Sequence, residues 1–296
     1  MRKTGFIAIV GLANAGKSTL TNALVGQKIS IVSPKPQTTR DSILGIWTDE
    51  DSQMIFVDTP GFLQSKNALG DYMLRSIDTA VQDVDAIVVV IDGHDGISDR
   101  EIAQIVKYRK QNVPVVVAVS KTDITQPTKL MPELAKLNDV EGVAEVYCVS
   151  AKRNNGVTEL KQALKKYLTG TEMYFEEDDL TDRSQRYLVA EIIREKILLC
   201  CENEIPHGIG VFINKMTDET GVWDIDATIV VEKASHKPII LGKQGSKIKS
   251  IGIHARQSIE KLLQAEVYLT LWVKVKEDWR NNARMLNELG YSAKKD

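Results

Sequence analysis

The chain has 296 residues, 43% hydrophobic and 26% charged, an ordinary globular composition whose length predicts two domains. Three cysteines are too few for a disulfide framework, and no apolar run approaches the roughly 20 residues that a membrane-spanning helix needs. The N-terminal apolar run is too short for a signal peptide and is followed directly by a glycine-rich loop, so we expect a cytoplasmic protein.

The net charge of −2 is distributed unevenly along the chain. Residues 183–296 carry 18 basic and 15 acidic side chains, whereas the preceding residues carry 20 and 25. Residues 233–261 alone contain seven basic residues and one acid, Glu260. Exposed charges act over about 8–10 Å, so a polyanion would respond to this local excess and not to the overall charge.

The first motif follows the apolar run at residues 6–10 and has the sequence Gly11-Leu12-Ala13-Asn14-Ala15-Gly16-Lys17-Ser18. Residues 19–24 continue it with a helical pattern, so a G-x-x-x-x-G-K-S loop joins a strand to a helix. Its glycines permit a close approach to phosphate, and the N–H groups at the helix N-terminus favour an anion. Lys17 would then reach the β- and γ-phosphates, and the Ser18 hydroxyl would ligate Mg²⁺. The alternative is a glycine-rich turn with an incidental lysine.

The remainder of residues 1–172 alternates between predicted strands and helices. Residues 27–40 contain two prolines and predict a loop, and residues 43–47 and 54–57 predict a β-hairpin. Further strands are expected at 86–91, 115–119 and 146–149, and helices at 72–82, 101–110, 132–137 and 156–168. This alternation predicts an α/β domain with a doubly wound, mostly parallel sheet.

Polar motifs follow several of these strands, at the sheet edge where α/β proteins bind ligands. They are Asp58-Thr59-Pro60-Gly61, Ser120-Lys121-Thr122-Asp123 and Ser150-Ala151-Lys152. The phosphate loop and the Thr38-Thr39 loop precede these three motifs in the sequence. The five motifs in this order resemble the translation-factor-like P-loop GTPases. Each short motif alone would be explained as a polar turn.

This resemblance implies a guanine-nucleotide site. The Asp123 carboxylate can accept two hydrogen bonds from guanine, and adenine offers no such pair of donors. The expected catalytic residues are Lys17, Thr39, Asn14 and Gly61, and the expected Mg²⁺ ligands are Ser18, Thr39 and Asp58. The expected GTP-binding residues are Gly11, Leu12, Ala13, Asn14, Ala15, Gly16, Lys17, Ser18, Thr19, Asp58, Thr59, Pro60, Gly61, Ser120, Lys121, Thr122, Asp123, Ser150, Ala151 and Lys152.

Two positions depart from the pattern of these GTPases. Ser120 replaces the asparagine of N-K-x-D and lacks the amide that, by the resemblance, ties this loop to the base and the phosphate loop. We therefore expect weaker nucleotide binding with the guanine preference retained. Phe62 stands where Ras-like GTPases place the glutamine that orients the attacking water, which predicts slow hydrolysis. Asn14 resembles the residue of GTPases that bind K⁺ beside the phosphates; the alternative is a turn-capping asparagine.

The acidic residues 173–182 predict a linker to a second domain over residues 183–280, with a C-terminal helical tail at 281–296. A helix is expected at 187–198, a hairpin from strands 210–216 and 223–231 turning through 217–221, a helix at 254–263 and a last strand at 267–275. Between them, a G-x-x-G loop leads into helical spacing from Ile248 to Ile251.

This loop and the order of the surrounding elements resemble an α+β type II KH module. In that module the glycines let single-stranded RNA lie against the backbone, and lysines meet the phosphates. The RNA-binding residues that the resemblance implies are Gly242, Lys243, Gln244, Gly245, Lys247 and Lys249. A plain turn with solvated lysines is the alternative.

The two halves together resemble the Era family of bacterial GTPases over nearly the whole chain, including residues 37–40, 188–196 and 271–276. The resemblance implies a GTP-hydrolysing switch that uses GTP or GDP and Mg²⁺, with K⁺ as a candidate further ion. It also implies binding of the 3′ end of 16S rRNA, a role in maturation of the 30S ribosomal subunit, a monomeric state and peripheral membrane contact.

Two other functions stay open. The first is an RNA-binding protein with a structural, barely hydrolysed guanine nucleotide, which Phe62 and Ser120 favour. The second is a P-loop ATPase or kinase, against which Asp123 argues.

Overall fold

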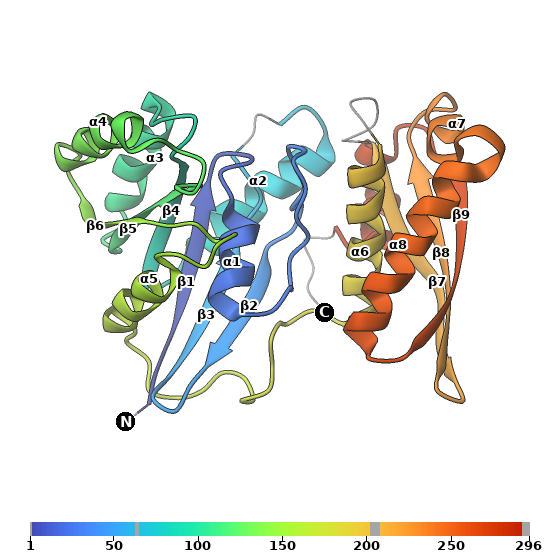
Figure 1. The fold of residues 1–296 in the computed structure, drawn as a ribbon, viewed down its shortest axis with the longest axis horizontal. Helices are drawn as coiled ribbons and strands as arrows, with labels where there is room; N and C mark the ends of the chain where they lie inside the picture. Colours follow the sequence, from blue (N-terminus) through green and yellow to red (C-terminus); the bar gives the residue numbers. More distant parts are fainter. Residues whose placement is uncertain (1, 63–64, 202–207, 292–296) are drawn as a thin grey trace. The chain divides into compact units, whose positions relative to one another are not determined.

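The computed structural model describes residues 2–62, 65–201 and 208–291, which fall into two compact units. The first unit comprises Met1–Val32, Thr39–Leu63 and Met73–Asp182. The second comprises Arg183–Asp296 together with two short segments, Ser33–Thr38 and Gln64–Tyr72. The two units are described separately below (Figure 1).

The first unit is built on a six-stranded sheet. Its strands are β1 (Lys3–Gly11), β2 (Ile43–Thr48), β3 (Ser52–Asp58), β4 (Ala86–Asp92), β5 (Val115–Ser120) and β6 (Val143–Cys148). The spatial order is β2-β3-β1-β4-β5-β6, in which β2 pairs with β3 antiparallel and the other neighbours pair in parallel. Strands β4 and β5 are buried along their whole length, which explains their unbroken runs of valine, isoleucine and alanine.

Helices cover both faces of this sheet, as predicted. They are α1 (Lys17–Val25), α2 (Ala68–Ala80), α3 (Asp99–Arg109), α4 (Pro127–Asn138) and α5 (Val157–Leu164), which continues into a 3₁₀ turn (Lys165–Tyr167). The first residues of α2, up to Tyr72, group with the second unit, and the rest of the helix groups with the first. Helices α3 and α4 pack on β4 and β5 through one cluster that includes Ile105, Tyr108 and Leu137. Helix α5 lies beside α1, where Lys161 of α5 donates to the Leu24 carbonyl.

Helix α4 begins five residues earlier than the sequence predicts. Pro127 occupies a first-turn position, where a helix does not need the missing N–H, and Pro132, the predicted start, lies inside the helix. The pattern of apolar residues thus located the helix, but the wrong proline was taken as its boundary.

The acidic segment expected as a linker runs along the first unit. Gln53 Nε2 donates to Phe175 O at 2.9 Å, Ile46 N donates to Leu180 O at 2.9 Å, and Arg2 pairs with Glu177 at 2.6 Å. Because β2 is an edge strand, the bond to Leu180 satisfies part of its open hydrogen-bonding edge. The segment therefore belongs to the first unit up to Asp182.

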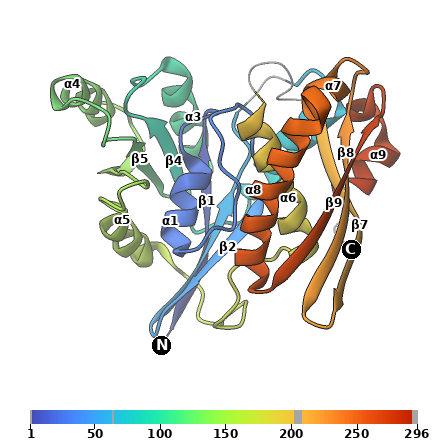
Figure 2. The ribbon, with the colours of Figure 1, turned by 45° about the vertical axis from the view of Figure 1, so that its right-hand side comes forward.

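The second unit combines a three-stranded sheet with helices. Its elements are α6 (Gln185–Cys200), β7 (Ile209–Glu219), β8 (Val222–Val231), α7 (His236–Leu241), a 3₁₀ turn (Lys243–Gly245), α8 (Ser246–Leu263), β9 (Glu266–Val275), a second 3₁₀ turn (Trp279–Asn281) and α9 (Ala283–Glu288). Strand β8 pairs antiparallel with β7 and parallel with β9. Helices α6 and α8 lie side by side on one face of the sheet and form its core with α7 (Figure 2).

Two element boundaries differ from the prediction for this unit. Helix α8 runs unbroken from Ser246, eight residues before its predicted start, because Gly252 is accommodated inside the helix. The hairpin turns through Thr220 and Gly221 alone, whose φ angles of 60° and 89° suit a tight two-residue turn. The strands are therefore longer than the polar sequence at 217–221 suggests.

The C-terminal segment packs on the second unit. Trp279 is buried and donates from Nε1 to Gly208 O at 3.0 Å, and Leu289 lies against the position of Gly210. Within the predicted helical tail the structure has the short helix α9, while residues 292–296 lie outside the described residues. Among the described residues, no helix has the length and apolar character needed to cross a membrane.

Candidate functional site

The phosphate loop joins β1 to α1 with backbone angles that require glycine at two positions. Gly11 has a φ of 150°, and a Cβ there would lie 2.3 Å from the Val90 carbonyl oxygen. Gly16 has a φ of 96° and immediately precedes α1. Asn14 also adopts a left-handed conformation, with a φ of 65°. This geometry places the N–H groups at the start of α1 beside the loop, where they can bind an anion.

Lys17 is held over this loop by main-chain carbonyls. Its Nζ donates to Gly11 O at 3.2 Å and to Leu12 O at 2.9 Å, and the residue is only 6% exposed. Burial lowers the pKa of Lys17 to about 8, against the opposing effect of the Asp58 carboxylate. The ammonium group is thus poorly compensated until an anion binds beside it.

Three oxygen-bearing side chains meet near Lys17. Asp58, at the end of β3, is completely buried, and neither of its carboxylate oxygens accepts a hydrogen bond from the side chains and backbone that the structure describes. Burial raises the pKa of Asp58, opposed by the nearby Ser18 hydroxyl and the Lys17 ammonium group. Ser18 Oγ lies 2.7 Å from Thr39 Oγ1. Hydroxyl and carboxylate oxygens are the ligands that Mg²⁺ prefers, so this set fits that ion.

The Asp58–Gly61 motif lies directly against the phosphate loop. A Cβ on Gly61 would be 2.6 Å from Ala13 Cα, and Thr59 Oγ1 donates to Ile9 O at 2.8 Å. Phe62, which follows Pro60 and Gly61, donates from its N–H to Gly11 O at 3.2 Å. The Phe62 ring stacks on Tyr108, with centroids 6.3 Å apart, and packs against the core of the first unit. It is a partly buried apolar side chain with no group that can orient a water molecule.

The loops after β5 and β6 are tied to each other and to the phosphate loop. Ser120 Oγ donates to Ala15 O at 2.6 Å, and Ser150 Oγ donates to the Asp123 carboxylate at 2.8 Å. Thr122 N donates to Val149 O at 3.4 Å, and Ala151 and Lys152 follow in the next turn. Although Ser120 lacks the amide of asparagine, its hydroxyl reaches the Ala15 carbonyl and ties this loop to the phosphate loop. The weaker nucleotide binding expected from the sequence stays a prediction.

Two charged residues of this region were missed by the sequence analysis. Asp92, the last residue of β4, accepts from Lys121 Nζ at 2.5 Å, and Arg153 Nε lies 3.9 Å from Asp123. Asp92 pairs in register with Ser120, so its place at the carboxyl end of a strand was the available signal. These contacts hold Lys121 and Asp123 in place in the loops expected to contact guanine.

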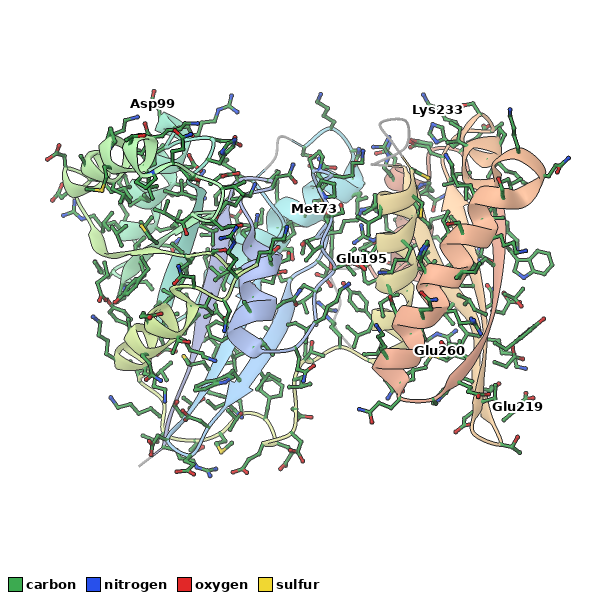
Figure 3. The ribbon with its side chains drawn as sticks, in the orientation of Figure 1. Met73, Asp99, Glu195, Glu219, Lys233 and Glu260 are labelled. Carbon is green, nitrogen blue, oxygen red and sulfur yellow. The ribbon has the colours of Figure 1, made fainter. Side chains whose placement is uncertain are left out.

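The G-x-x-G loop of the second unit also depends on its glycines. Gly242 has a φ of 70°, and a Cβ there would lie 2.7 Å from the Cβ of Lys247. At Gly245, with a φ of 76°, the only described atom that a Cβ would meet belongs to Ile248, at 4.0 Å, so this side of the loop is open to an approaching backbone. Lys243, Gln244 and Lys249 are exposed, and Lys247 is half-buried. The loop lies within residues 233–261, the stretch with seven basic residues and one acid. Lys233 and Glu260, near the two ends of this stretch, are labelled in Figure 3.

Beside this loop lies a groove of about 340 Å³ between α8 and β9. Its apolar floor and basic rim are formed by Ile248, Lys249, Gly252, Ile253, Arg256, Leu269 and Leu271. The sequence analysis did not assign the groove, although Ile248, Gly252 and Arg256 recur every fourth residue along one face of the helix. An apolar floor with a cationic rim suits unstacked bases attached to phosphates.

Curated relatives match this chain over its full length. GTPase Era of Clostridium kluyveri is 45% identical over 294 residues, which cover 98% of this chain and 100% of the relative. GTPase Era of Clostridium botulinum is 43% identical over 296 residues, which cover both chains completely. The chain belongs to the Era family of GTPases. Membership in the Era family confirms the resemblance inferred from the motifs.

Family models and solved structures agree with this assignment. Residues 6–121 match the model of a 50S ribosome-binding GTPase, and residues 204–280 match that of a KH domain. A variant of Aquifex aeolicus Era bound to GDP and AlF4⁻ is 37% identical, with a TM-score of 0.93 over 98% of this chain and 99% of that one. Era in complex with MgGDPNP and nucleotides 1506–1542 of 16S ribosomal RNA is 37% identical, with a TM-score of 0.94 over 99% and 100%. The predicted fold class, a GTPase domain followed by a KH domain, is confirmed.

The Ser120 hydrogen bond predicts a measurable effect on nucleotide affinity. We expect Ser120→Ala to weaken binding of both GDP and GTP about three- to tenfold, because losing one hydrogen bond costs roughly 0.5–1.5 kcal/mol and loosens the phosphate loop. Ser52→Ala is the matched control, since Ser52 Oγ donates to Asp49 in a turn at the start of β3. Titration with fluorescent nucleotides measures both. Equal affinities for the wild type and Ser120→Ala would contradict this assignment.

The depressed pKa of Lys17 predicts pH-dependent nucleotide binding. In the nucleotide-free protein Lys17 loses its proton as the pH rises through about 8, whereas bound phosphates favour the charged form. Binding should therefore take up protons, and the affinity for GDP should fall as the pH is raised from about 7 to about 9. Calorimetry in two buffers of different ionisation enthalpy measures the uptake directly. No proton uptake near pH 8 would show that Lys17 is already charged.

Proposed function

We propose that this chain is a GTP-hydrolysing switch that binds the 3′ end of 16S rRNA through its KH domain and assists maturation of the 30S subunit. The observation that carries the proposal is the group of side chains at the phosphate loop that suits phosphates and Mg²⁺. There the buried Lys17 and Asp58 lie near the hydroxyls of Ser18 and Thr39, which contact each other. Supporting it, the Era structure with MgGDPNP and 16S rRNA nucleotides belongs to a relative of the same fold.

In the first unit, each site residue has a defined part in nucleotide binding. Lys17 neutralises the β- and γ-phosphates, and Asp123, oriented by Ser150, selects guanine. Ser18, Asp58 and Thr39 would hold Mg²⁺, which neutralises charge on the transferred phosphate. By analogy with other GTPases, Thr39 completes this set only with a γ-phosphate present, so hydrolysis would release the loop around it.

In the second unit, the G-x-x-G loop and the adjacent groove form the proposed RNA site. Lys243 and Lys249 are exposed and would meet phosphates, while Gly242 and Gly245 would leave the loop backbone accessible to RNA. The apolar side chains of α8 and β9 offer surfaces for bases. A site for ribosomal RNA would place the protein in the cytoplasm. The monomeric state and peripheral membrane contact implied by the family resemblance stay predictions.

An RNA-binding experiment tests the switch. We expect an RNA with the sequence of nucleotides 1506–1542 to bind more tightly in the presence of GDPNP than of GDP, because only GDPNP carries a third phosphate for Lys17 and Thr39. Fluorescence anisotropy measures both affinities, and multiple-turnover GTP hydrolysis is assayed in parallel. Equal RNA affinities and no turnover would favour the alternative, an RNA-binding protein with a structural nucleotide.

The same assay locates the RNA surface. Lys243→Ala should weaken RNA binding and reduce the salt dependence by about 0.7 in the log–log slope, the value for one lost phosphate contact. Lys215→Ala is the matched control, since Lys215 lies on β7 of the same unit and pairs with Asp224 and Glu219. A reduced slope for both variants would show that only net charge matters.

We further propose that Asn14 supports a K⁺ ion beside the phosphates, which would supply the transition-state charge that Phe62 cannot. GTP hydrolysis should then be at least about tenfold faster in KCl than in NaCl of equal ionic strength, and Asn14→Ala should abolish the difference. Asn112→Ala is the control, because Asn112 has a similar left-handed conformation, with a φ of 58°, in the turn after α3. Equal rates in the two salts would remove the role of K⁺.

A further inference from the structure

The loop before Thr39 has an unusual place in the fold. Residues 33–38 group with the second unit, although the elements on either side of them in the sequence, α1 and β2, belong to the first. The chain therefore passes from the second unit into the first at the peptide that joins Thr38 to Thr39. Thr39 is the residue proposed to sense the third phosphate.

The segment 33–38 is internally bonded. Thr38 Oγ1 donates to Lys35 O at 2.7 Å, and Ser33 Oγ lies 2.7 Å from Thr38 Oγ1. The Lys35 N–H in turn donates to Ser33 Oγ at 3.1 Å. These bonds close the segment into a compact turn, which limits the movement of Thr38 relative to Ser33 and Lys35.

Arg194 of α6 anchors this turn. The residue is only 1% exposed, and its Nη2 donates to Thr38 O at 2.5 Å. Its guanidinium is oriented by Glu191, one helical turn earlier, which accepts from Nε at 2.7 Å and from Nη2 at 2.5 Å. Burial alone would lower the pKa of Arg194, but the Glu191 carboxylate, together with Tyr291 and Tyr187, raises that pKa overall, so the residue stays charged.

The bond acts on a specific peptide plane. The Thr38 carbonyl and the Thr39 N–H belong to one planar group, so fixing the direction of the carbonyl fixes the direction of the Thr39 N–Cα bond. On the other side of Thr39 Cα, its Oγ1 lies 2.7 Å from Ser18 Oγ at the Mg²⁺ site. Arg194 and Ser18 thus restrain two neighbouring groups of the same backbone.

We propose that Arg194, oriented by Glu191, is a positioning residue that presents Thr39 to the magnesium site and couples the nucleotide state to helix α6 of the KH domain. The proposal rests on the proposed function. Coupling is reciprocal, so a nucleotide that favours the seated Thr39 also favours the Arg194–Thr38 bond. Because GDP lacks the γ-phosphate that Thr39 responds to, the contact should discriminate between the two nucleotides.

The experiment compares full-length wild-type, Arg194→Lys and Arg194→Gln proteins. Lysine keeps the charge beside Glu191 but lacks the planar fork that reaches two acceptors. We expect GDPNP affinity to fall about tenfold in both variants, with more Mg²⁺ needed for half-maximal GDPNP binding, because a hydrogen bond from a charged group is lost. GDP affinity should stay unchanged. Arg186→Gln is the matched control, because Arg186 also lies on α6 and donates to a main-chain carbonyl, that of Ile213.

A double-mutant cycle with Thr39→Ala isolates the route of the effect. If Arg194 acts through Thr39, Arg194→Lys should cause no further loss of GDPNP affinity once the Thr39 hydroxyl is absent. Additive losses, or an equal fall in GDP and GDPNP affinity, would overturn the proposal. RNA binding without nucleotide should be unchanged in Arg194→Lys, which verifies that the KH domain is folded.

The nucleotide measurements are independent of the proposed switch. If RNA affinity proves the same with GDP and GDPNP in the wild type, the switch function fails. The GDPNP and GDP affinities of the Arg194 variants would still test whether Arg194 positions Thr39.

Discussion

Two opposite charges, Lys17 and Asp58, are buried at the phosphate loop of the first unit and influence each other's pKa. Burial lowers the pKa of Lys17 and raises that of Asp58, so each ionised group is costly where it stands. Their mutual attraction offsets part of this cost, and phosphates and a divalent cation would offset more. The sheet can hold such groups because Asp58 ends a fully buried strand and Lys17 begins a helix packed on it. The packed core therefore holds two buried charges at a cost in stability, and binding of phosphates and a cation would reduce that cost.

Both the phosphate loop and the G-x-x-G loop require glycines, but for different physical reasons. At Gly11 and Gly61 the neighbouring backbone is so close that a Cβ would collide with it, so these residues allow segments of the first unit to approach one another. At Gly245 no backbone of the described residues lies so close, and the absent side chain leaves the loop open. The nucleotide loops are thus closely packed and tied together by Ser120 and Ser150, while the KH loop presents its backbone outward.

Much of this organisation follows from local sequence signals. Apolar runs located the strands, and polar motifs at their carboxyl ends predicted the nucleotide loops, because both depend on short-range pattern and sheet topology. Boundaries were less predictable where prolines or glycines lie inside helices, as at Pro132 and Gly252. The bond from Ser120 to Ala15 and the groove between α8 and β9 join residues distant in sequence, so no local pattern specified them. The roles of the individual site residues stay predictions.

Arg194 shows why a motif-based analysis stops short of the coupling between domains. The residue lies inside a helix that its apolar spacing already explains, and its partner is a main-chain carbonyl, which has no side-chain identity to recognise. A buried guanidinium is costly where its donors lack acceptors. Glu191 and Thr38 accept from Nε and Nη2 of Arg194, whereas Nη1 is buried without a partner among the described residues, so these two acceptors constrain where α6 can hold the side chain. The same constraint supports the proposed coupling. A charged, planar donor tolerates little displacement of its acceptor, so a small backbone movement at Thr39 would weaken the hydrogen bond between Thr38 and Arg194 of α6. A neutral or more flexible side chain could follow the moving Thr38 carbonyl and would not transmit the movement to α6.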